Sequence, residues 1–171
     1  MMHQVQFEQW VPFPIDKVFL FFANPQNLPR IMPPETATEI LALKLKPPPV
    51  VAMGRPDNWD SLAGAGSEIV TSFRLLPFLP FRGRWVALIT EFEWNRHFAD
   101  VQQKGPFKSF QHRHQLARTT RDQVSGTIIR DVIDYEVGFG PLGELADKFF
   151  IAQQLQRTFA YRQSALVKLL S

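Results

Sequence analysis

The chain has 171 residues, of which 45% are hydrophobic and 20% charged, so we expect one domain (1–171) with a substantial core rather than a disordered chain. Nineteen basic and sixteen acidic residues leave a formal charge of +3 that is scattered along the chain, which disfavours nucleic-acid binding. The absence of cysteine excludes disulfides, thiolate nucleophiles and cysteine-ligated metals. The sequence shows no leader pattern and no membrane-spanning run, so we expect a cytosolic (cytoplasmic) protein.

The first part of the chain alternates between strand and helix patterns. Residues 4–11 alternate with a period of two, which predicts a first strand. Hydrophobic residues between 15 and 22 recur at spacings of three and four, which predicts a helix that begins near Pro14 and is followed by a short second turn. Residues 35–46 alternate again and end at three consecutive prolines, where no strand ladder can continue.

The middle of the chain predicts an antiparallel meander. Alternating segments separated by short Asn, Gly, Pro or Asp turns predict five more strands, at 67–76, 85–94, 97–105, 109–118 and 124–137. Two Pro-rich connections interrupt the pattern. Residues 47–65 are interpreted as a mobile or partner-facing loop, and residues 76–84, with three large apolar side chains, as a candidate lid.

The last segment predicts one long helix. From Pro141 onwards, apolar residues keep helical spacing over about 28 residues, which corresponds to roughly 42 Å at 1.5 Å per residue. A helix of this length can lie across an entire curved sheet and bury one stripe on it. The predicted order is therefore strand, two short helices, six strands and a long helix.

That order resembles the helix-grip fold of the START-related, or SRPBCC, superfamily, an α+β fold in which a seven-stranded antiparallel sheet curves around a long C-terminal helix. FPIDKVFLFFANPQNLPRIMPP, ITEFEW, GPF, FQHRH and DVIDY look like segments of a bacterial, ligand-binding subgroup, over essentially the whole chain. The superfamily includes lipid-transfer domains, birch pollen allergen-like proteins and aromatase/cyclases that act on polyketides. The cyclases' catalytic residues do not map onto this sequence.

The resemblance implies a cavity between sheet and helix that binds a small hydrophobic or aromatic molecule, such as a lipid, polyketide or isoprenoid. It implies no cofactor and no nucleic-acid partner, and it leaves the ligand's identity and the oligomeric state open. An aromatase/cyclase-type enzyme and an interaction domain with a filled core are the alternatives. A filled core would leave no cavity, whereas a binding protein needs roughly 300 Å³ or more.

The residues themselves point to a buried polar cluster. If strands 109–118 and 124–137 form a hairpin that closes near Arg121 and Asp122, paired residue numbers add up to about 243, and His112 lies opposite Asp131. The alternation then places the two histidines on an inward face, because the other face carries charged and amide side chains. The predicted ligand-binding residues are Trp85, Asp100, Gln102, Phe110, His112, His114, Asp131 and Tyr135.

Several interpretations of this cluster remain open from the sequence. It can be a structural network that satisfies its own hydrogen bonds, or the polar end of a ligand site. A His-Asp pair also suits general acid-base catalysis, in which case His112→Ala would abolish turnover rather than weaken binding. His112 and His114 could both reach one metal ion from the same strand face, with Asp100 or Asp131 as the third ligand. Two histidines at positions i and i+2 are a weak metal signal, so we assign neither a metal nor catalytic residues.

Overall fold

A seven-stranded antiparallel sheet forms one layer of the protein in the residues that the structure describes. The computed structural model describes residues 1–50, 56, 58–74, 81–138 and 140–171. The spatial order of the strands is β1-β7-β6-β5-β4-β3-β2, so each strand from β2 to β7 pairs with its neighbours in sequence and β1 joins beside β7. The strands are Met2–Val11 (β1), Glu39–Lys44 (β2), Glu68–Arg74 (β3), Arg82–Glu93 (β4), His97–Lys104 (β5), Ser109–Arg121 (β6) and Val124–Glu136 (β7).

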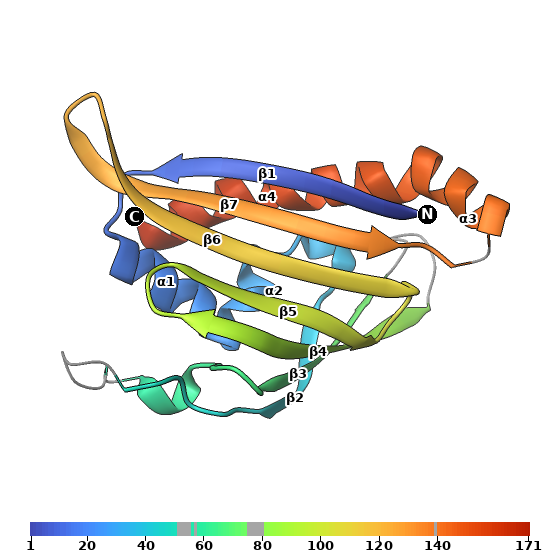
Figure 1. Cartoon of the computed structure of the whole chain (residues 1–171), viewed down its shortest axis with the longest axis horizontal. Helices are drawn as coiled ribbons and strands as arrows, with labels where there is room; N and C mark the ends of the chain where they lie inside the picture. The colour runs from blue at the N-terminus through green and yellow to red at the C-terminus, as the bar shows by residue number, and fades with distance from the viewer. Residues whose placement is uncertain (51–55, 57, 75–80, 139) are drawn as a thin grey trace.

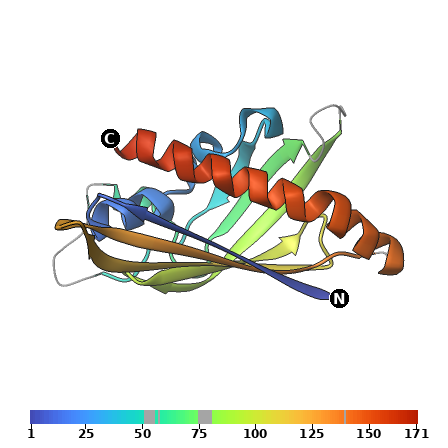
Figure 2. The same ribbon diagram turned by 90° about the horizontal axis from the view of Figure 1, so that it is seen from above.

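Helices cover one face of this curved sheet (Figures 1 and 2). The C-terminal segment comprises α3 (Gly140–Ala146), a π-helical turn (Asp147–Ile151) and α4 (Ala152–Leu170), and α4 lies across the sheet. The short helices α1 (Ile15–Ala23) and α2 (Leu28–Ile31) lie near the C-terminal end of α4. This arrangement confirms the predicted helix-grip fold.

Buried apolar side chains hold α4 on the sheet. The Phe159 ring stacks on Phe7 of β1 with centroids 4.3 Å apart, and Phe159 is 3% exposed. Further along the helix, Leu166 enters a cluster with Val18 and Phe19 of α1. Each such side chain contributes about 1.5–3 kcal/mol through its burial. In the described part of the chain, every helix is too short or too polar to span a bilayer.

A buried hydrogen bond fixes the start of this helical segment. The Tyr135 hydroxyl of β7 donates to Asp147 Oδ1 over 2.7 Å, and His3 Nδ1 of β1 lies 3.3 Å from Asp147 Oδ2. Asp147 begins the π-helical turn and is buried. Burial and the Asp147 carboxylate raise the pKa of Tyr135, so its hydroxyl stays a donor. Tyr135 therefore anchors the helix to the sheet.

The register of the β6–β7 hairpin differs from the prediction by two residues. Arg121 pairs with Val124, the two-residue loop is Asp122 and Gln123, and paired numbers add up to 245, so that His114 and not His112 lies opposite Asp131. Both loop residues have positive φ, at 49° and 66°. Because side chains alternate, a shift of two leaves every residue on its predicted face.

Other predicted boundaries shift where local turns intervene. Residues 34–36 form a 3₁₀ turn that ends at Ala37 with φ 43°, so β2 begins at Glu39 instead of residue 35. Residues 76–80 of the candidate lid lie outside the described residues, as do residues 51–55 and 57 of the predicted loop. Of the lid's apolar side chains, Phe81 is described and is 72% exposed.

The hairpin loop yields a stability prediction. Two-residue hairpin loops with positive φ at both positions favour glycine at the second, and Gln123 bears the steric cost of a Cβ there. We therefore expect Gln123→Gly to increase the free energy of unfolding by about 0.5–1 kcal/mol in urea titrations. Thr120→Gly, at an exposed strand position of the same hairpin, should instead decrease it by about 0.5–1 kcal/mol. Destabilisation by Gln123→Gly would contradict this loop geometry.

Candidate functional site

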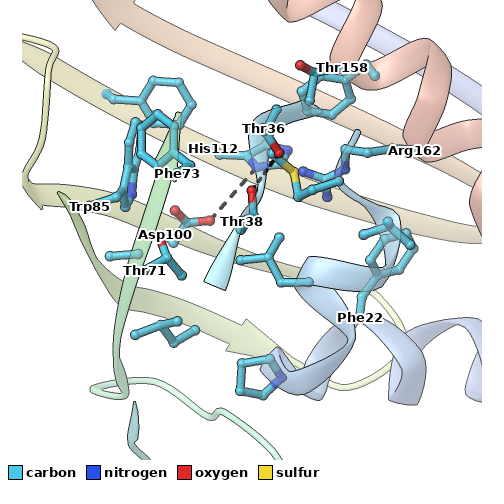
Figure 3. A pocket seen from close by; sticks show the side chains of 18 of the residues that line it. Phe22, Thr36, Thr38, Thr71, Phe73, Trp85, Asp100, His112, Thr158 and Arg162 are labelled. Carbon is cyan, nitrogen blue, oxygen red and sulfur yellow. Dashed lines mark hydrogen bonds and ion pairs between the residues drawn. The ribbon is translucent and has the colours of Figure 1, made fainter. Parts of the chain in front are cut away.

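A cavity of about 300 Å³ separates the sheet from the helices. Its wall is formed by β3 to β6 on one side and by α1, α2 and α4 on the other (Figure 3). The lining is mainly apolar and aromatic, which is typical of sites for small organic molecules. The aromatic members from the sheet side are Phe73, Trp85, Phe98, Phe107 and Phe110.

Trp85 is the centre of the aromatic wall. Its ring meets Phe110 edge-on at a centroid distance of 4.7 Å and Phe107 at 5.8 Å. Phe73 of β3 contacts it from the other side at 6.1 Å. These edge-to-face contacts hold the rings in fixed orientations, so the apolar end of the cavity has a defined shape.

Four polar side chains from three adjacent strands of the same sheet form a group that we call the polar floor: Asp100 of β5, His112 and His114 of β6, which line the cavity, and Asp131 of β7 behind the two histidines. Asp100 pairs across the strands with His112, and Asp131 with His114. His112 Nε2 lies 3.0 Å from Asp131 Oδ1 and forms a hydrogen bond with it. His114 Nδ1 lies 2.6 Å from the same oxygen, but the angles at this contact are not those of a hydrogen bond.

The hydrogen bond to Asp131 determines which nitrogen of His112 carries the proton. A carboxylate is only an acceptor, so Nε2 of His112 must donate, and in a neutral imidazole Nδ1 is then an acceptor. That Nδ1 lies 3.9 Å from Asp100 Oδ2, with both side chains on the cavity wall (Figure 3). Two acceptors therefore face each other at the edge of the cavity, and a donor or a cation between them would satisfy both.

The histidines are buried and resist protonation. Burial, together with the neighbouring His114, lowers the pKa of His112 to about 4, although Asp131 and Asp100 oppose the shift. Burial also lowers the pKa of His114, and this effect outweighs the pull of Asp131. For Asp131, burial acts to raise the pKa, but the interactions with His114 and His112 outweigh it and hold the pKa below its usual range. Neutral imidazoles beside an ionised Asp131 are the result at neutral pH.

Asp100 and Arg162 both lie on the cavity wall. Burial raises the pKa of Asp100, opposed by His112 and Arg162, so this carboxyl gains affinity for a proton. Burial lowers the pKa of Arg162, opposed by Asp131 and Asp100. The Arg162 guanidinium lies over the Phe159 ring at 4.7 Å, and His112 meets the same ring edge-on. Arg162 therefore interacts electrostatically with Asp100 and Asp131 and contacts the aromatic ring of Phe159.

The structure brings five of the eight predicted residues to the cavity wall: Trp85, Asp100, Phe110, His112 and His114. Asp131 lies behind the histidines as their partner, and Tyr135 anchors the helix through Asp147. Gln102 is directed elsewhere, because its amide donates to the Phe107 carbonyl and accepts from the Phe107 N–H, and so closes the β5–β6 turn.

Several polar residues of the wall were missed by the sequence analysis: Thr36, Thr38, Thr71, Thr158 and Arg162. Arg162 had a signal, since it continues the inward spacing of Leu155 and Phe159 towards Leu166, where a charged residue is unusual. Thr36 and Thr38 carried none, because a hydroxyl in a turn or loop does not report which way it points.

Comparison with solved structures places the fold among known ones. A START superfamily protein from Mycobacterium smegmatis superposes with a TM-score of 0.67 at 15% identity, covering 99% of both chains. Norcoclaurine synthase from Thalictrum flavum, in complex with dopamine and hydroxybenzaldehyde, gives 0.64 at 13% identity over 99% of this chain and 87% of that one. A protein from Thermus thermophilus gives 0.64 at 14% identity over 98% of this chain and 97% of that one.

The chain therefore has the helix-grip fold of START-related (SRPBCC) proteins, as its sequence segments had indicated. No protein-family model matches the sequence, and no curated protein matches it either. At 12–15% identity the structural comparisons show the fold alone.

The polar floor yields a second prediction. Asp131→Ala removes the carboxylate shared by two buried imidazoles, so the free energy of unfolding should fall by about 3 kcal/mol. Asp134→Ala is the matched control, because Asp134 lies on the other face of β7, where its carboxylate accepts from the exposed Gln4 amide. That variant should change stability by no more than about 0.5 kcal/mol in the same urea titrations. Equal losses in both variants would show that Asp131 has no special structural role.

Proposed function

We infer that this protein binds a small, largely aromatic or aliphatic molecule in the cavity between the sheet and α4. The observation that carries the inference is the cavity itself: about 300 Å³ of space with fixed aromatic walls and a polar floor at one side. An interaction domain with a filled core would not keep such a space, because protein interiors are close-packed.

The polar floor supports a further statement about the ligand. The acceptor face of His112 Nδ1 and the Asp100 carboxylate would recognise a hydroxyl or an N–H group on an otherwise apolar molecule. A ligand without a donor would leave both acceptors unpaired in a dry site, which costs about 1–3 kcal/mol. The presence of dopamine and hydroxybenzaldehyde in a solved structure of the same fold is in line with a hydroxylated aromatic ligand.

Filling the cavity should weaken binding. Ala87 of β4 lies on the cavity wall between Trp85 and Ile89, so Ala87→Phe would place a phenyl ring in the binding space. With naphthol as the probe, followed by its fluorescence, we expect saturable one-to-one binding to the wild type and at least a ~10-fold weaker affinity for the variant.

Gln103→Phe is the control for this experiment, because it adds the same ring at an exposed position of β5. It should bind naphthol as the wild type does, and circular dichroism should show both variants folded. Unchanged naphthol affinity in the folded Ala87→Phe protein would overturn the proposed binding site.

The donor requirement is tested by changing the probe. Methoxynaphthalene has the ring system of naphthol but cannot donate a hydrogen bond. If the ligand's donor meets His112 Nδ1 and Asp100, naphthol should bind about 10-fold more tightly, which corresponds to about 1.4 kcal/mol. Equal affinities would leave binding in the apolar cavity intact but contradict the role of the polar floor in recognition.

A further inference from the structure

The polar floor also has the composition of a metal centre. Asp100, His112 and His114 each offer one ligand atom within 4.8 Å of the others. Both histidines are buried, and all three side chains lie on the cavity wall. Two imidazoles and a carboxylate are a ligand set that proteins use for divalent transition metals.

Asp131 has the role that an outer carboxylate plays in such centres. It contacts His112 at Nε2 and His114 at Nδ1, which leaves Nδ1 of His112 and Nε2 of His114 for a ligand. Metal-binding histidines usually direct their second ring nitrogen to a carboxylate or carbonyl, which fixes the tautomer and the ring orientation. Here one buried carboxylate forms this hydrogen bond with His112 and contacts the ring of His114.

The distances require little adjustment for the best-defined pair. Zinc binds nitrogen and oxygen ligands at about 2.0–2.2 Å, so two ligands of a tetrahedral ion are roughly 3.3 Å apart. His112 Nδ1 and Asp100 Oδ2 are 3.9 Å apart, and they come from residues that are paired directly across β5 and β6. A cation between His112 Nδ1 and the Asp100 carboxylate would satisfy both of these acceptors, which otherwise face each other without a donor.

Charged side chains surround this set of ligands: Asp131 contacts both histidines, and Arg162 lies on the cavity wall. The cavity lies on the open side of the three ligands, so a fourth position would be available to water or to an oxygen of the guest.

We propose that Asp100, His112 and His114 bind a divalent transition-metal ion of the zinc class, oriented by Asp131, at the polar floor of the cavity. This proposal does not rest on the proposed function, because metal binding can be measured in the protein alone. The structure distinguishes the two aspartates: Asp100 of one neighbouring strand would be the third ligand, and Asp131 of the other strand would be the outer carboxylate.

The test is a zinc titration of the untagged, chelator-treated protein, in which a chromophoric chelator competes for the metal and reports the affinity. In a second titration, the visible absorption of bound cobalt reports the geometry of the ligands. We expect one ion per chain in the wild type. Asp100→Asn keeps the side chain's size but removes its charge, and should weaken zinc binding by at least ~100-fold. A loss of this size exceeds the roughly 10- to 100-fold effect of removing a residue that only orients a ligand.

A second variant and a control complete the design. His114→Phe removes both ring nitrogens but keeps a ring that can stack on Phe98, as His114 does at 4.3 Å, and should abolish one-to-one binding. His97→Ala removes a histidine that lies between Glu91 and Glu93, outside the polar floor, and should leave zinc affinity unchanged. Absence of zinc binding in the wild type, or unchanged affinity in Asp100→Asn, would overturn the proposal.

Discussion

The shared carboxylate of Asp131 is the interaction on which the site depends. A single oxygen lies 3.0 Å from His112 Nε2 and 2.6 Å from His114 Nδ1, so one side chain of β7 sets the orientation of two rings on β6. Burying these groups separately would cost several kcal/mol, and the hydrogen bond between His112 and Asp131 offsets part of that cost. Because Asp131 occupies the inner side of both rings, their remaining nitrogens are left for the cavity.

The cavity follows from how the apolar side chains are distributed. One core cluster packs the C-terminal half of α4 against α1, and another packs Phe159 against Ile133 and Phe7. A third cluster lies around Ile69 of β3 and Ala87 of β4, and its described members come from strands and loops rather than from α4. The first two clusters hold α4 at separate places, and the cavity lies between this helix and the sheet.

Much of this arrangement was accessible from the sequence, and the failures have physical causes. Period-two alternation predicted all seven strands and the inward face of the two histidines, because alternation survives a register error of two residues. The register itself failed, since Asp122 and Gln123 carry none of the Asn-Gly chemistry that marks such a loop. Gln102 shares the parity of Asp100, yet its amide finds the Phe107 backbone, a contact that pattern alone does not reveal.

The central claim is that the cavity between the sheet and α4 holds a guest. Native mass spectrometry of the untagged protein purified from a cell extract tests it most directly. The account predicts an additional non-covalent mass that is lost on denaturation and is absent from the Ala87→Phe protein. Bare chain mass for wild type and variant alike, even after incubation with naphthol, would contradict it.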